Sequence, residues 1–169
     1  GGIRWKLLHV SPEVGAWTAI FDCPKGSSFA RHIHVGPGEY LLTKGRMEVR
    51  GGSESGGDTA DALGYGYEAC NARHDRTYFP EASEFYMTFL GPLQFINEDG
   101  SPIAVVSWEQ VQGAWAAAQQ QAAAEKLKDL KLAEAVADKQ TELTNSQVEI
   151  DITRNRGDAK LAMARKQSE

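Results

Sequence analysis

The sequence has few cysteines, few histidines and no long apolar stretch, and these shortages exclude several classes of protein. No run of about 18 apolar residues occurs, so we expect no membrane-spanning helix and no membrane partner. The net charge of −5 offers no basic track for phosphates, which argues against a nucleic-acid-binding protein. With no recognisable secretory leader, we expect a soluble cytoplasmic protein.

The chain has only two cysteines, Cys23 and Cys70. Without an export signal, we expect two buried free thiols rather than a disulfide. A chain of 169 residues with 41% hydrophobic content can bury one ordinary core and carry an appendage.

Short apolar or alternating runs, bounded by Gly, Pro, Asn or Asp, fill the chain up to about residue 112. They are rich in β-branched and aromatic residues, as strands are. Without a helical pattern between them, they predict an all-β domain over residues 1–112, built as an antiparallel sandwich or barrel. The Gly/Ser-rich stretch 50–61 is expected to be a flexible surface loop. The expected strands cover residues 16–23, 30–35, 40–50, 65–70, 84–96 and 103–108.

The composition changes after residue 113, where Ala, Gln, Lys and Glu dominate. This composition predicts a helical C-terminal extension over residues 113–169, interrupted at 145–158 and followed by a short helical end. The extension is either a partly solvated tail or an oligomer contact, and both interpretations stay open. Its apolar positions form a stripe too thin to define a coiled coil, namely Leu127, Leu130, Ala133 and Ala137.

Two of only four histidines lie close together in "RHIHVGPGEY", residues 31–40. On a strand, alternate residues point to the same face, so His32 and His34 aim their imidazoles the same way. His74 follows another expected strand, and an antiparallel neighbour could return it to the same pocket. Three neutral imidazoles suit zinc, iron, copper or nickel and leave positions open for a substrate. The alternative is ordinary surface or core histidines.

The spacing around these histidines resembles the first cupin motif, which implies a β-sandwich or jelly-roll barrel. The last interval is one residue shorter than in the motif. His74 takes the place of the histidine of the second cupin motif, although "EACNARH" stands where Pro-x-Gly is usual. The residues of the first motif are, in order, Gly26, His32, His34, Glu39 and Gly45.

Within the cupins, four longer phrases closely resemble the acetylacetone-cleaving, or β-diketone, dioxygenases. They are "HIHVGPGEYLLTKGRMEVRGG", "GYGYEACNARH", "FYMTFLGPLQFINEDG" and "WEQVQGAW". The resemblance extends from about residue 3 to about residue 120. It implies a homo-oligomer, a tetramer in this family, with one non-haem Fe(II) held by His32, His34 and His74. Zinc or another divalent metal is an alternative occupant of the isolated protein.

The resemblance also implies that Glu39 is not a ligand, although many cupins use a glutamate at this position. It turns Tyr40 toward the pocket, which by alternation turns Glu39 away. The alternation of side chains along a strand cannot be extended through Gly36-Pro37-Gly38. The sequence alone therefore does not decide whether Glu39 is a fourth ligand. We favour three histidines.

Further residues around the metal are implied by the same resemblance. The polar, catalytic side comprises Tyr40, Arg50, Glu68 and Thr77. The apolar, substrate-binding side comprises Phe29, Phe85 and Phe89.

Two of these assignments are open on sequence grounds. Arg50 and Glu68 end different expected strands, so they form either an inward ion pair or two solvated side chains. Phe29 has the opposite parity to His32, so a bulge near Ala30 would be needed to turn it inward.

The activity implied by the resemblance is cleavage of a carbon–carbon bond of a β-dicarbonyl compound by O2. Acetylacetone would give acetate and methylglyoxal. Three neutral ligands leave a divalent ion its full charge, which stabilises an enolate chelated through both oxygens. Another three-histidine cupin reaction, such as hydroxy-ketone cleavage or isomerisation, and a non-enzymatic metal-binding module remain alternatives.

Overall fold

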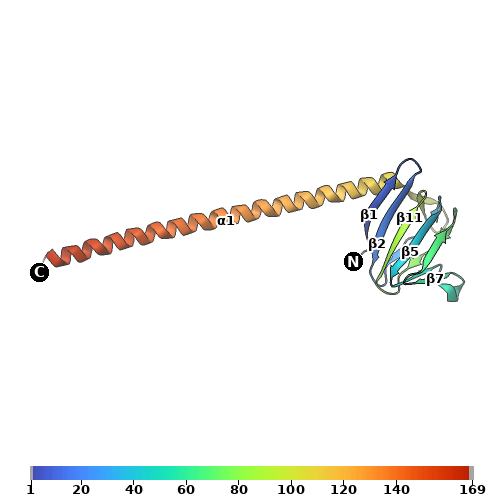
Figure 1. Ribbon diagram of the computed structural model, residues 1–169, viewed down its shortest axis with the longest axis horizontal. Helices are drawn as coiled ribbons and strands as arrows, with labels where there is room; N and C mark the ends of the chain where they lie inside the picture. Colours follow the sequence, from blue (N-terminus) through green and yellow to red (C-terminus); the bar gives the residue numbers. More distant parts are fainter. Residues whose placement is uncertain (1, 168–169) are drawn as a thin grey trace. The chain divides into compact units, whose positions relative to one another are not determined.

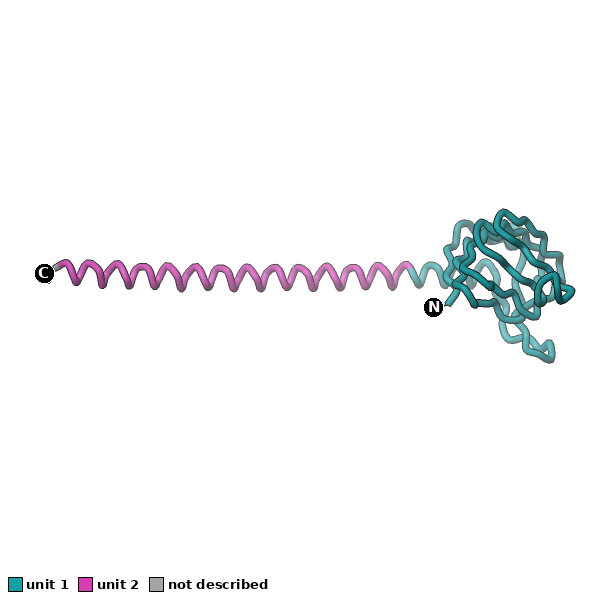
Figure 2. Tube along the Cα trace, turned by 90° about the horizontal axis from the view of Figure 1, so that it is seen from below, with its two compact units in different colours: residues 1–118 teal, residues 119–169 magenta. Residues whose placement is uncertain are grey.

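The computed structural model describes residues 2–167, and the chain divides into two compact units, Gly1–Ala118 and Gln119–Glu169 (Figure 2). Short strands make up most of the first unit. They are β1 Arg4–Ser11, β2 Ala16–Cys23, β3 Ser28–Phe29, β4 His32–His34, β5 Gly38–Lys44, β6 Arg46–Val49, β7 Asp58–Asp61, β8 Tyr65–Glu68, β9 Arg73–His74, β10 Thr77–Tyr78, β11 Ser83–Phe89, β12 Leu93–Ile96 and β13 Pro102–Val106. A 3-10 turn spans Ser53–Ser55, and one helix, α1, spans Trp108–Gln167.

The strands form three sheets, and neighbouring strands run antiparallel, as expected. The largest sheet has the order β1-β2-β11-β5-β8, and its labelled strands β1, β2, β11 and β5 lie side by side in Figure 1. The other two sheets have the orders β3-β10-β6-β7 and β13-β12-β4-β9. Sequential strands are therefore divided among sheets, so that β3 and β4, two residues apart, belong to different sheets.

The expectation of an all-β protein was only partly correct. The described strands form open sheets and do not close into one barrel. The helix accounts for 60 of the 169 residues, which is too much for an appendage to an all-β fold.

Several expected strands are confirmed and others are divided. Strand β2 matches the prediction for 16–23, whereas the predicted run 40–50 forms two strands on either side of Gly45. The predicted run 84–96 likewise forms β11 and β12. The supposed flexible loop at 50–61 contains a strand, because β7 pairs with β6. Composition alone did not reveal this pairing, since β7 consists mostly of polar residues, with an exposed aspartate at each end.

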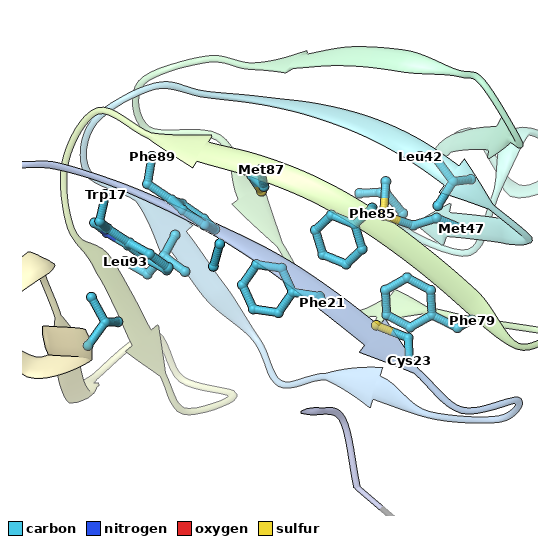
Figure 3. Close-up of a cluster of buried hydrophobic side chains, with 13 residues drawn as sticks. Trp17, Phe21, Cys23, Leu42, Met47, Phe79, Phe85, Met87, Phe89 and Leu93 are labelled. Atoms are coloured by element: carbon cyan, nitrogen blue, oxygen red, sulfur yellow. The ribbon is translucent and has the colours of Figure 1, made fainter. Parts of the chain in front are cut away.

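The hydrophobic core lies between the sheets and is rich in aromatic rings (Figure 3). The rings of Trp17 and Phe89 stack with centroids 3.8 Å apart, and Phe21 stacks on Phe85 at 4.8 Å. Cys23 is buried in this core, where burial, with a smaller effect of Asp22, raises its thiol pKa to about 12. Both cysteines are free, as predicted, but Cys70 is exposed rather than buried.

Helix α1 is continuous from Trp108 to Gln167, so the predicted interruption at 145–158 was wrong. That stretch holds Gly157 and several β-branched residues but no proline. A glycine inside a helix costs only about 1 kcal/mol, whereas a proline would clash with the preceding turn. Within residues 2–167, no helix combines the length and apolar content needed to cross a membrane.

A close contact between two glycines fixes the turn that follows β4. A Cβ added at Gly36 would lie 2.5 Å from the carbonyl oxygen of Leu90 and 2.8 Å from the Cα of Gly91. Both obstacles are backbone atoms, which cannot move aside as a side chain can. The glycines therefore let the chain after β4 pass directly against the turn between β11 and β12.

We predict that Gly36→Ala lowers the free energy of unfolding by about 1–3 kcal/mol, the usual cost of overpacking. Urea denaturation of the metal-free protein measures the change. Gly113→Ala is the matched control, because a Cβ at Gly113 meets nothing within 4 Å and the residue lies within a helix. Equal stability of both variants would mean that the backbone contact at Gly36 is not fixed.

Candidate metal centre

Three histidines converge inside the first unit, as the spacing predicted. His32 and His34 lie on β4, and β9 pairs with β4 so that His74 stands directly opposite His32. All three side chains are buried, and one potential ligand atom from each lies within 4.8 Å of the other two. The ring centroids are 5.0–5.2 Å apart. The expected return of His74 on an antiparallel neighbour is confirmed.

The surroundings keep two of these imidazoles neutral. Burial lowers the pKa of His34 to about 4, and it also lowers the pKa of His32. Nδ1 of His32 lies 2.7 Å from the carbonyl oxygen of Ala30. A carbonyl only accepts, so Nδ1 carries the proton and Nε2 keeps its lone pair. Neutral imidazole with its second nitrogen oriented by a backbone carbonyl is the usual form of a metal-binding histidine.

Glu68 contacts the histidine cluster directly. Its Oε2 accepts a hydrogen bond from Nε2 of His74 at 2.5 Å, and the side chain is largely buried. Burial raises the pKa of the Glu68 carboxyl, but the His74 hydrogen bond and the neighbouring imidazoles outweigh it and leave the pKa below its ordinary value. Thr77, also buried, places Oγ1 3.4 Å from Nδ1 of His74. Both ring nitrogens of His74 therefore face polar side chains, so one of these two contacts must open for His74 to bind a metal.

Tyr40 and Glu39 point to opposite sides of β5. Tyr40 lines the cavity that contains the histidines, whereas Glu39 is exposed and is not among the clustered ligands. Tyr40 pairs in register with Gly66 on β8, and a Cβ there would lie 2.3 Å from the Tyr40 ring. Only glycine leaves room for the ring. Burial, and then the charge of Glu68, raises the pKa of Tyr40, which stays protonated as a hydrogen-bond donor.

The cavity beside the histidines has a volume of about 320 Å³. Its lining combines the histidines and a few other polar side chains with a larger number of aromatic and aliphatic side chains. Phe29 reaches it because β3 belongs to a different sheet from β4, so no bulge at Ala30 is needed. The ring of Phe89 lies nearly parallel to that of His34, with centroids 6.0 Å apart. The sequence-derived candidates that line it are His32, His34, His74, Tyr40, Glu68, Thr77, Phe29, Phe85 and Phe89.

Arg50 is the candidate that the structure does not bring into this cavity. Its guanidinium donates to Asp58 at 2.8 Å and is about half exposed, so the inward pair with Glu68 is absent. Arg50 directly follows β6 and has φ 54, and it lines a second cavity of about 570 Å³. Tyr40, Glu68 and His74 line both cavities.

The sequence reasoning missed the far, apolar end of the cavity. Trp17 and Phe21 come from β2, and their spacing of four residues on an expected strand was the available signal. Two further segments contribute apolar residues that no sequence pattern indicated, because their place in the cavity depends on tertiary packing. The N-terminal strand supplies Trp5, and the first turns of α1 supply Val111 and Ala114.

Antiparallel sheets around a buried cluster of metal-ligand histidines define the chain as a cupin. The family model described as the ChrR cupin-like domain matches residues 1–94. The chain is 62% identical over 123 residues to the acetylacetone-cleaving enzyme of Acinetobacter johnsonii, covering 73% of this chain and 80% of that protein. It therefore belongs to the ChrR cupin-like domain family and to the family of the acetylacetone-cleaving enzymes.

Two solved structures are similar to the first unit. One, from Methylibium petroleiphilum PM1 and provisionally assigned as an acetylacetone dioxygenase, is 77% identical with a TM-score of 0.68, covering 69% of this chain and 81% of that one. The acetylacetone dioxygenase of Acinetobacter johnsonii is 63% identical with the same TM-score of 0.68, covering 69% and 78%. Each of these two matches leaves about a third of this chain without a counterpart.

We predict that alanine at His32, His34 or His74 lowers the bound metal content about tenfold or more, because each change removes one of three ligands. Elemental analysis after loading with a divalent metal and gel filtration measures it. Glu39→Gln should retain the metal, since Glu39 is exposed. Loss of metal in Glu39→Gln, or its retention in two histidine variants, would contradict this ligand set.

Proposed function

We propose that this enzyme uses O2 to cleave a carbon–carbon bond of β-dicarbonyl compounds, converting acetylacetone to acetate and methylglyoxal. Both atoms of O2 enter the products, so no reductant is needed. The observation that carries the proposal is the buried three-histidine cluster, in a chain 62% identical to an acetylacetone-cleaving enzyme.

The proposed metal is Fe(II), held by His32, His34 and His74. The donor set fits, because neutral imidazoles suit iron and none of the clustered ligands is a carboxylate. When bound, Fe(II) would supply the affinity for the dicarbonyl oxygens and the redox change needed to use O2. Zinc also fits three imidazoles but has no accessible redox change. It would occupy the site without supporting oxygen chemistry.

The polar side of the cavity would bind and orient the reacting part of the substrate. Glu68 is ionised at neutral pH and lies against the cluster, so its Oε2 can accept the proton that a β-diketone loses when it becomes an enolate. Tyr40 can donate a hydrogen bond from its phenol group, and Thr77 can fix the ring of His74. These three side chains position charge without being ligands.

The apolar side would receive the alkyl ends of the substrate and exclude water. Phe29, Phe85 and Phe89 line the same cavity as the histidines. An apolar wall beside a few placed polar groups is typical of small-molecule sites. Arg50 would act from the second cavity, where it can shape the approach to the wall formed by Tyr40, Glu68 and His74.

We further propose a homo-oligomer, a tetramer by resemblance to the family. Tyr86, Leu41 and Tyr65 support it, because they lie in register across β11, β5 and β8 and are each at least 39% exposed. Such a row of apolar side chains suits a subunit contact. A cytoplasmic location is consistent with the two free thiols, which stay reduced there.

The first functional prediction concerns the metal. Protein loaded anaerobically with Fe(II) should consume one O2 per acetylacetone and release acetate and methylglyoxal, whereas zinc-loaded protein should consume none. An oxygen electrode and product chromatography measure this. Oxygen uptake with a hydroxy-ketone but with no β-diketone would instead indicate another cupin reaction. No uptake at full iron occupancy with either substrate would favour a metal-binding module.

The second functional prediction concerns Glu68. Glu68→Gln should lower the turnover of acetylacetone about tenfold to hundredfold while keeping the metal, because it removes a charge beside the substrate without removing a ligand. Single-turnover kinetics, first without oxygen and then with it, locate the loss in enolate formation or in the later step. Glu39→Gln provides the control for loss of one acidic charge on an exposed face. Wild-type rates in Glu68→Gln would remove this carboxylate from the reaction.

A further inference from the structure

The second unit has large apolar side chains along its whole length. The described part of the unit is helical, and its exposed aliphatic residues and methionine are each between 46% and 68% accessible (Figure 1). They are Leu127, Leu130, Leu132, Val136, Leu143, Val148, Ile150, Ile152, Leu161 and Met163. Contiguous exposed apolar surface of this kind generally marks a contact surface.

These residues fall on two opposite sides of the helix. At 3.6 residues per turn, one group lies within about 40° around the axis and the other within about 60° on the far side. The first group, here named the Leu132 line, consists of Leu132, Val136, Leu143, Ile150 and Leu161. Its spacings of four, seven, seven and eleven residues keep to one face. The opposite group has a gap between Leu130 and Val148, so only the Leu132 line continues along the helix.

Charged residues lie on the same face at both ends of the line. Glu125 and Asp129 precede it, Lys139 borders it in the middle, and Arg154 lies toward its other end. Two copies aligned in parallel would bring Asp129 against Asp129 and Arg154 against Arg154. Two antiparallel copies would bring each Asp129 near the Arg154 of the other. Opposite charges at the border of an apolar contact favour one orientation over the other.

We propose that two copies of this chain pair antiparallel through the Leu132 line. An alignment that places Leu132 of one copy opposite Ile150 of the second also brings Asp129 within one residue of being opposite Arg154. The same register serves the hydrophobic and the ionic contacts, and twofold symmetry repeats each contact twice. A second copy of this chain is a suitable partner because the same face carries the acidic residues at one end and Arg154 toward the other.

Cross-linking of the full chain tests the orientation. In a Cys70→Ser background, which removes the exposed thiol, Asp129→Cys and Arg154→Cys proteins are prepared separately and as an equimolar mixture. Mild oxidation of the mixture should join position 129 to position 154 about tenfold faster than either protein alone forms a disulfide. Mass spectrometry of the linked peptides identifies the positions. Faster 129–129 and 154–154 links would establish parallel pairing and overturn the proposal.

Charge reversal tests the ionic contacts independently. Asp129→Arg and Arg154→Asp should each weaken association about tenfold, and the double variant should recover it, as followed by sedimentation velocity. Two parallel copies would show no such recovery.

A matched pair of variants tests the apolar contact. Leu143→Asp should abolish the 129–154 link, whereas Thr144→Asp should not, because Thr144 lies on the same turn but between the two apolar groups. Circular dichroism checks that both variants keep the helix. If the 129–154 link does not form in proteins whose Leu132 line is unchanged, and the helix is intact, then a second copy does not cover this face.

Discussion

Backbone pairing between His32 on β4 and His74 on β9 is the constraint on which the centre depends. A ladder of main-chain hydrogen bonds fixes the distance between opposed side chains whatever those side chains are. His34 then follows by the alternation of β4. The ligands are thus held by the sheet before a metal arrives, which limits the rearrangement that binding requires. A shift of β9 by one residue would turn His74 to the other face and dismantle the site.

The apolar surroundings and the polar centre act on each other. Aromatic rings exclude water from the imidazoles, and the same burial holds the pKa of His34 near 4. A neutral ring can bind a metal, whereas a protonated ring cannot, so the hydrophobic wall keeps the histidine cluster in the form that metal binding would require. Among the described residues that line the cavity, Glu68 is the only carboxylate, and its contact with His74 makes up for the burial of its charge. The same side chains therefore determine both the packing and the chemistry of the cavity.

Much of the centre could be predicted from the sequence because it rests on short-range periodicity. The parity of His32 and His34 and the divergence of Glu39 from Tyr40 follow from strand alternation. The residues that sequence reasoning misplaced depend on contacts that no local pattern records. Arg50 was expected inside, but its left-handed backbone directs it toward Asp58. Phe29 was correctly expected in the cavity, but the bulge thought necessary for it is absent, because β3 and β4 belong to different sheets. The helix was predicted to break at 145–158 because the composition there resembles that of a loop. Composition does not show that every residue of that stretch fits within a helix.

Tyr40, Glu68 and His74 line the metal-side cavity and the polar cavity at once, so the partition between the two spaces is one side chain thick. A substitution at any of these three positions would therefore alter both spaces together. The polarity of the metal-side cavity and that of its neighbour cannot be changed independently at these positions.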